Sequence, residues 1–171
     1  MNRLKDYIEK LNLQPHPEGG FYKRNWQSSF VGDVKNASGK QTHTKRPLGS
    51  SILYFLPSTE RCAWHKVACE EMWHHYDGSP LRMHLLQMQK GWESFILGSD
   101  VLKGELPQIV IPPHTWFAAE VVEADSYSFC GCSLWPAFTY ADFELAEEHR
   151  LMDEFPKYQD RLKPWFKPQA N

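Results

Sequence analysis

The chain has 171 residues, enough for one domain with a substantial core, and its 42% hydrophobic and 23% charged residues are ordinary for a globular protein. The net charge of −2 and the scattered lysines and arginines argue against a nucleic-acid partner, which would require a basic surface. No apolar run approaches the roughly 18 residues that span a bilayer, so we expect no membrane partner.

The N-terminal region, residues 1–14, is expected to form a short helix. Leu4, Ile8 and Leu11 recur at helical spacing, and the helix must end before the run Pro15-His16-Pro17-Glu18-Gly19-Gly20. Charged and apolar residues alternate at the start of the chain, whereas a signal peptide would need a continuous apolar stretch. We therefore expect a cytoplasmic protein.

Residues 20–135 are expected to form an all-β sandwich or barrel. Short apolar segments are separated by turn residues every 8–12 positions, a pattern typical of these folds. Residues 27–50 interrupt them with a polar stretch that predicts a loop or an exposed hairpin. The expected strands are 21–26, 51–56, 61–69, 71–76, 81–89, 92–97, 108–111, 115–122 and 126–134.

The C-terminal part changes its periodicity. Apolar residues recur within a charged stretch over residues 140–155, which predicts a helix, and residues 163–168 are expected to lack regular structure. We see no repeat and no boundary, so residues 1–171 are expected to be one domain.

Four cysteines are expected to be thiols in a reducing compartment. The pair Cys130 and Cys132 is separated by one residue and lacks the two-residue gap of common zinc and redox motifs. Cys62, Cys69 and this pair are therefore interpreted as small buried residues.

His65 and Glu71 are the central candidates for chemistry. They lie on two consecutive strands joined by a short turn, and a mutual hydrogen bond between them would give an acid/base pair, a ligand clamp or half of a metal site. Strand alternation places Trp73 and His75 on the same face as Glu71 unless a bulge intervenes, so both are candidate pocket residues.

The segment from about Leu11 to Phe155 resembles the cupins, and within them the uncharacterised cupin subfamily 5. Two motifs resemble the general cupin pattern, and four more resemble the subfamily. The general motifs are His-x5-Glu-x6-Gly at His65, Glu71 and Gly78, and Ile111-Pro112-Pro113-His114-Thr115-Trp116-Phe117; the others are Leu13 to Tyr22, Glu71 to His74, Gly78 to Leu81 and Ala141 to Leu145. The resemblance implies a double-stranded β-helix, the cupin jelly-roll barrel, commonly paired as a dimer.

Two positions depart from the metal-binding pattern of the cupins. Val67 and Phe117 stand where that pattern has histidines, and neither side chain can hold a metal, which normally needs three or more side-chain ligands. We therefore expect no cofactor and no stoichiometric metal. If a metal binds, its ligands should be His65, Glu71 and His75, with His114 as a further possible donor.

The leading hypothesis is a protein that binds a small polar metabolite without metal, as an isomerase or epimerase acting on a sugar or keto compound. The resemblance to metal-free epimerase cupins implies His65 as base, Glu71 as its orienting partner and Tyr54 as acid. Two alternatives stay open: a non-catalytic small-molecule binder, and a metal-dependent dioxygenase or isomerase.

Further residues are candidates for holding the ligand. Arg24 could fix an anionic group by a bidentate contact, and Glu18 could contact ligand or merely cap a turn. Trp73, His75 and Phe117 complete the expected ligand-binding set. The strand 21–26 is free to pair across a two-fold axis, so we also expect a homodimer.

Overall fold

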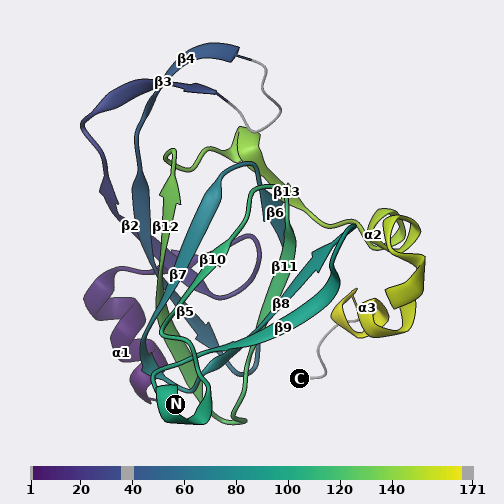
Figure 1. Ribbon diagram of the computed structural model, residues 1–171. Helices are drawn as coiled ribbons and strands as arrows, with labels where there is room; N and C mark the ends of the chain where they lie inside the picture. Colours follow the sequence, from purple (N-terminus) through teal and green to yellow (C-terminus); the bar gives the residue numbers. More distant parts are fainter. Residues whose placement is uncertain (1, 36–40, 167–171) are drawn as a thin grey trace.

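The computed structural model describes residues 2–35 and 41–166. Within them the strands form a six-stranded sheet in the order β1-β2-β5-β12-β7-β10, a five-stranded sheet in the order β13-β6-β11-β8-β9, and the hairpin β3-β4. The hairpin projects from one end of the two main sheets (Figure 1). The strands are β1 (Gln14–Pro15), β2 (Phe21–Gln27), β3 (Val31–Lys35), β4 (Gln41–Pro47), β5 (Ser50–Pro57), β6 (Arg61–Val67), β7 (Glu70–Gly78), β8 (Leu81–Gln87), β9 (Gly91–Leu97), β10 (Gln108–Ile111), β11 (Trp116–Val121), β12 (Tyr127–Trp135) and β13 (Phe143–Leu145).

The core lies between the two main sheets. Alternate residues of each strand point inward, so Tyr54 and Leu56 of β5 meet Met83 and Leu85 of β8 within one buried cluster. The two sheets pack face to face because each has one apolar side to bury. This arrangement confirms the expected all-β jelly-roll.

Helices cover the outer side of each sheet. Helix α1 (Asn2–Leu11) lies on the six-stranded sheet, where the ring centroid of Tyr7 is 4.9 Å from that of Phe129. Helices α2 (Glu148–Glu154) and α3 (Gln159–Phe166) lie on the five-stranded sheet, and Leu151 and Leu162 pack there in a cluster with Trp64. Figure 1 shows these helices on opposite sides of the molecule. None of the helices in the described ranges is long and apolar enough to cross a membrane.

The C-terminal part contains more regular structure, and a shorter helix, than the sequence predicts, while the polar stretch 27–50 takes one of its two expected forms. The helix expected over residues 140–155 is limited to α2, because 140–142 form the 3₁₀ turn η2 and 143–145 add β13 to the edge of β6. The expectation of no regular structure was wrong over 163–166, where α3 continues to Phe166, and residues 167–168 lie outside the described part. The polar stretch 27–50 contains the hairpin, although residues 36–40 lie outside the described part.

A β-bulge in β6 shapes the interior. Phe117 of β11 is paired with His65 and Ala119 is paired with Cys62. The two β11 residues are two positions apart and the two β6 residues are three positions apart, so β6 contains one extra residue here. The extra residue breaks the alternation, and both Cys62 and His65 face the core while Trp64 between them packs on the outer side.

Candidate functional site

A cavity of about 300 Å³ lies between the sheets. One water occupies about 30 Å³ of liquid, so the space suits a ligand of roughly ten non-hydrogen atoms. Its wall combines polar and apolar side chains. The lining residues are Gln14, His16, Glu18, Tyr22, Arg24, Ile52, His65, Val67, Glu71, Leu134, Phe138, Tyr140 and Phe143.

The buried centre of the wall is an ion pair between His65 and Glu18. Nε2 of His65 lies 3.0 Å from Oε2 of Glu18, and the two side chains are only 2% and 5% exposed. Nδ1 of His65 lies 2.7 Å from the carbonyl oxygen of Ala63. Both ring nitrogens therefore have a protein acceptor. The hydrogen bond expected between His65 and Glu71 is not formed, because Glu18 takes that place.

The loop that carries Glu18 is fastened to the bulge of β6. The N–H of Ala63, at the bulge, donates to the carbonyl oxygen of Glu18 at 2.7 Å. Gly19 follows with φ 103°, and a Cβ there would lie 2.2 Å from the carbonyl oxygen of Arg61. Only glycine permits so close an approach. The Tyr54 hydroxyl donates to the Gly19 carbonyl at 2.8 Å and holds the loop from the other sheet.

Cys62 completes the contacts of the Glu18 carboxylate. Its Sγ donates to Oε1 of Glu18 at 3.4 Å, and the residue is fully buried. Burial and the negative charge of Glu18 raise the pKa of this thiol well above its ordinary value. The cysteine is therefore a neutral donor that helps to stabilise the Glu18 carboxylate.

Each member of the ion pair favours the charged form of the other. Burial alone would raise the pKa of Glu18, but the charge and hydrogen bond of His65 bring it below the ordinary value. Burial likewise opposes charging of His65, yet the charge and hydrogen bond of Glu18 raise the pKa of the imidazole. His16, 3.6 Å from Glu18, has its pKa lowered by its own burial and stays neutral.

Glu71 has the opposite charge state. Burial raises the pKa of its carboxyl to about 8, and the negative charge of Glu18 adds to this effect while His65 opposes it. The single imidazolium of His65 already balances Glu18. Glu71 is therefore largely protonated at pH 7 and presents a hydrogen-bond donor to the cavity.

The remaining predicted residues divide between the cavity wall and its support. Arg24 lines the cavity and is exposed, with one guanidinium nitrogen 3.0 Å from Oε1 of Gln27. Trp73 is fully buried, and the Phe117 ring packs 4.0 Å from the ring centre of His65. Tyr54, Trp73, Phe117 and His75 do not line the cavity. His75 instead places Nε2 3.2 Å from the carbonyl oxygen of Ser79.

Sequence reasoning missed several residues of this site. Cys62 was interpreted only as a small buried residue, and His16 was considered only as part of a turn-rich run. The run from Leu13 to Tyr22 resembles a motif of cupin subfamily 5, and this was the signal that could have directed attention to His16. The register of the bulge, which turns Cys62 inward, has no signal in the sequence.

The residues present do not fit the metal site that the cupin pattern implies. Val67 lines the cavity without a donor atom, and Phe117 packs against His65 where a second ligand would be needed. The alternative ligand set of His65, Glu71 and His75 does not bring its donor atoms together, because His75 does not line the cavity. Another set does: donor atoms of Glu18, Cys62 and His65 all lie within 4.8 Å of one another.

Solved structures include close relatives of this fold. A hypothetical protein from Leishmania major is similar over 94% of this chain and 97% of its own, with 26% identity and a TM-score of 0.83. A protein from Shewanella oneidensis is 29% identical, covers 96% of this chain and 97% of its own, and gives a TM-score of 0.82. Among curated proteins, no sequence matches this chain.

A more distant likeness concerns the fold alone. Oxalate decarboxylase from Bacillus subtilis is 8% identical, with a TM-score of 0.54 over 91% of this chain and 38% of that protein. The family described as "Cupin superfamily (DUF985)" matches residues 5–146, most of the chain. The chain therefore belongs to this family of the cupin superfamily.

Proposed function

We propose that the chain binds a small polar metabolite in the cavity and moves a proton on it without a metal, as an isomerase or epimerase acting on a sugar or keto compound. The observation that carries the proposal is the pair of carboxyl groups that line one cavity, Glu18 with its pKa lowered and Glu71 with its pKa raised to about 8. Two titratable groups whose environments push their pKa values apart are suited to act as base and acid.

The roles differ from those suggested by resemblance. Both nitrogens of His65 are engaged by Glu18 and Ala63, so His65 orients and stabilises the Glu18 carboxylate, which is the proton acceptor. Glu71 is the proton donor. Tyr54 holds the Glu18 loop through Gly19 and does not face the ligand.

Arg24 supports an anionic group on the ligand. It lines the same cavity as Glu71 and remains exposed, so its charge can meet a carboxylate or phosphate entering from solvent. The lining also includes the apolar side chains of Ile52, Val67 and Phe143. The ligand class is therefore a small anion whose carbonyl or hydroxyl group reaches Glu71.

Exchange of carbon-bound hydrogen with solvent tests the proton transfer directly. Keto-sugars and sugar phosphates are incubated with the protein in D₂O, and deuterium incorporation is followed by NMR. We expect exchange beside the carbonyl, reduced at least tenfold in Glu71→Gln and unchanged in Glu120→Gln, a matched carboxamide change on the outer side of the sheet. Equal exchange in both variants would refute the role of Glu71.

A non-catalytic binder is the competing hypothesis. It predicts a pocket lined mainly by tryptophan and phenylalanine with few convergent polar groups, whereas the observed wall contains Glu18, His65 and Glu71. Native mass spectrometry of the freshly purified protein can identify a bound metabolite. Tight binding of that metabolite without hydrogen exchange in the wild type would favour the binder.

A metal-dependent activity is the second candidate, and the converging donors of Glu18, Cys62 and His65 favour it. The Ala63 carbonyl orients His65 as such a carbonyl does in many metal sites. Elemental analysis separates the two proposals. The metal-free proposal expects well under one equivalent of metal per chain; one equivalent in the wild type, lost in Cys62→Ser and retained in Cys69→Ser, would establish the metal site instead.

We also propose that two copies pair through β2. β1 pairs with β2 only at Phe21 and Tyr22, so residues 23–27 have no further partner strand in the described ranges. Open strand edges favour pairing with another chain. Light scattering at micromolar concentration should give twice the mass of one chain, and a monomer would refute the proposal.

The four cysteines support a cytoplasmic location. All four are free and buried. Such thiols persist in reducing compartments. Fractionation of cells that express the full chain should recover it with cytoplasmic markers.

A further inference from the structure

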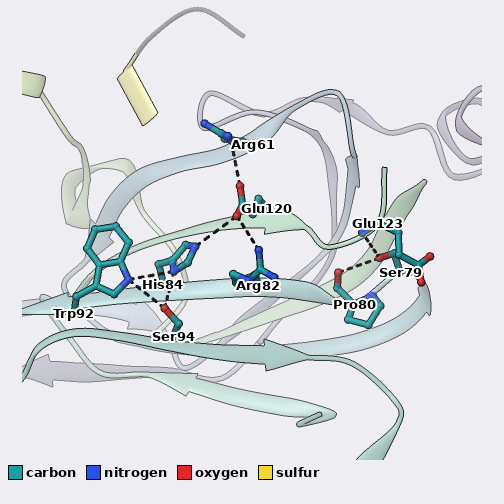
Figure 2. Close-up of polar contacts among 9 residues, drawn as sticks. All are labelled: Arg61, Ser79, Pro80, Arg82, His84, Trp92, Ser94, Glu120 and Glu123. Carbon is teal, nitrogen blue, oxygen red and sulfur yellow. Dashed lines mark hydrogen bonds and ion pairs between the residues drawn. The ribbon is translucent and has the colours of Figure 1, made fainter. Parts of the chain in front are cut away.

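The outer side of the five-stranded sheet carries a second cluster, in which Ser94, His84 and Glu120 lie in a row (Figure 2). Oγ of Ser94 lies 2.8 Å from Nδ1 of His84. On the other side of the ring, Nε2 of His84 lies 3.8 Å from Oε1 of Glu120. The three residues come from the neighbouring strands β9, β8 and β11, whose register places them side by side.

Trp92 fixes the position of the proton on His84. The indole N–H lies 3.1 Å from Oγ of Ser94 and 3.3 Å from Nδ1 of His84. An indole N–H can only donate, so its contact with Nδ1 of His84 favours the tautomer in which that nitrogen accepts and the ring proton sits on Nε2. The Ser94 hydroxyl therefore donates to Nδ1, while the Nε2 proton points at Glu120.

Glu120 is held in place for this contact. Arg61 approaches it to 3.4 Å and Arg82 to 3.3 Å (Figure 2). The pKa of Glu120 lies below its ordinary value, and the contact with His84 is the largest cause. His84 itself is buried, whereas Ser94 is exposed.

The edge position of β9 leaves a backbone donor beside the serine. Strand β9 has β8 on one side and, in the described part of the chain, no further strand of this sheet on the other. The carbonyl oxygen of Ile96 accepts a hydrogen bond from the N–H of Leu106, which is not part of β8, so the N–H and C=O of Ile96 point away from β8, toward the free edge. Ser94, two residues earlier, points its own N–H the same way. An N–H at this position can stabilise negative charge that develops on an acyl or phosphonyl oxygen.

We propose that Ser94 is an activated nucleophile that accepts acyl or phosphonyl groups from small esters, with His84 as its base and Glu120 as a positioning residue. In the acyl step, Oγ of Ser94 bonds to the carbonyl carbon, its proton passes to His84, and His84 returns it to the departing alcohol. Water then attacks the acyl carbon while His84 takes its proton, His84 passes that proton to Oγ of Ser94 as the acyl–oxygen bond breaks, and the acyl group leaves as a carboxylic acid. The order of the three roles is that of known serine hydrolases, here on an open sheet edge.

The chain provides a matched control on the other sheet. Oγ of Ser133 lies 3.4 Å from Nε2 of His74, and the far nitrogen of that ring faces the amide of Gln108 at 3.0 Å. Serine and imidazole are thus paired in both places. Of these two pairs, only that of Ser94 and His84 has a carboxylate, Glu120, next to the other ring nitrogen of the imidazole.

Labelling by a fluorophosphonate reagent tests the proposal on the full chain. The reagent forms a P–O bond to serine, loses fluoride and transfers the serine proton to the base. We expect peptide mass spectrometry to find the label on Ser94 at a rate at least tenfold above that on Ser133, and Ser94→Ala to abolish it. Equal labelling of the two serines, or label persisting elsewhere in Ser94→Ala, would overturn the proposal.

Two further measurements examine the partners. Release of nitrophenolate from p-nitrophenyl acetate should fall at least tenfold in Ser94→Ala and in Glu120→Gln, and should not change in Ser133→Ala. The ¹⁵N shifts of His84 should show the proton on Nε2 in the wild type and a loss of that preference in Glu120→Gln. A wild-type proton on Nδ1, or nitrophenolate release unaffected by Ser94→Ala, would contradict the mechanism.

Discussion

The two sides of the five-stranded sheet carry two carboxylate clusters that balance charge in different ways. Inside, Glu18 is 5% exposed and has a single charged partner, His65. Outside, Glu120 is 26% exposed and has two arginines together with His84. Solvent and several cations together stabilise the charge of Glu120. The interior pair of Glu18 and His65 depends on one contact, and its buried surroundings disfavour a second negative charge nearby. Burial, with the charge of Glu18 adding to it, keeps Glu71 protonated.

The largest expected effect concerns the pH dependence of stability through Glu71. Its pKa is about 8 in the folded chain against an ordinary 4.5, so the folded state holds the proton more tightly. The contribution is present in full below pH 4.5 and is lost as the pH rises through about 8. A difference of this size corresponds to about 5 kcal/mol. Urea unfolding of the wild type and of Glu71→Gln from pH 4 to 9 should show the wild type losing stability relative to the variant as the pH rises.

Glu120 supplies the contrast for that measurement. Its pKa is lowered, so its contribution is present above pH 4.5 and is lost as the pH falls below that value. Glu120→Gln should therefore lower stability by a nearly constant amount above pH 4.5, and its difference from the wild type should shrink only as the pH falls below that value. A pH dependence of that difference between pH 6 and 9 as large as that for Glu71→Gln would remove the distinction between the two clusters.

The next effect is the loss of the interior ion pair. Glu18→Ala leaves the imidazole of His65 buried without its partner, and breaking a buried pair costs roughly 3–5 kcal/mol. The midpoint of urea unfolding at pH 7 measures the loss. His65→Ala in the Glu18→Ala background should cost much less than His65→Ala alone, because the two residues act as a unit; additive losses would show that they do not.

A smaller effect is expected from Tyr54→Phe. This change removes the hydroxyl that donates to the Gly19 carbonyl and leaves that oxygen without its 2.8 Å partner. The cost should be about 1–2 kcal/mol in unfolding free energy. The same variant should lower metabolite binding only indirectly, through movement of the Glu18 loop. A loss of hydrogen exchange with no change in stability would instead place Tyr54 in the proton-transfer step.

The smallest effect is expected on the outer side. Glu120→Ala removes partly exposed ion pairs with Arg61 and Arg82, which solvent screens, so the cost should be under about 1 kcal/mol. Urea unfolding at low and high salt should show that most of the cost disappears in salt. A loss equal to that of Glu18→Ala would show that exposure does not distinguish the clusters.

The sequence determined the strand content and the main candidates for the site. Turn residues and alternation located the strands of both sheets except the short edge strands β1 and β13, because a half-buried strand leaves a period of two in the sequence. The spacing of His65 and Glu71 and the run before Gly19 directed attention to residues that line the cavity. The helix expected over 140–155 was too long, because β6 offered an open edge that 143–145 could join.

The tertiary structure alone decided which side chains meet. Cys62 and His65 are three residues apart, so regular alternation would place them on opposite faces, and only the bulge opposite β11 brings both inward. The same bulge frees the Ala63 N–H to hold the loop of Glu18, which therefore replaces Glu71 as the partner of His65. A bulge depends on the register between strands distant in sequence, and local patterns do not record that register.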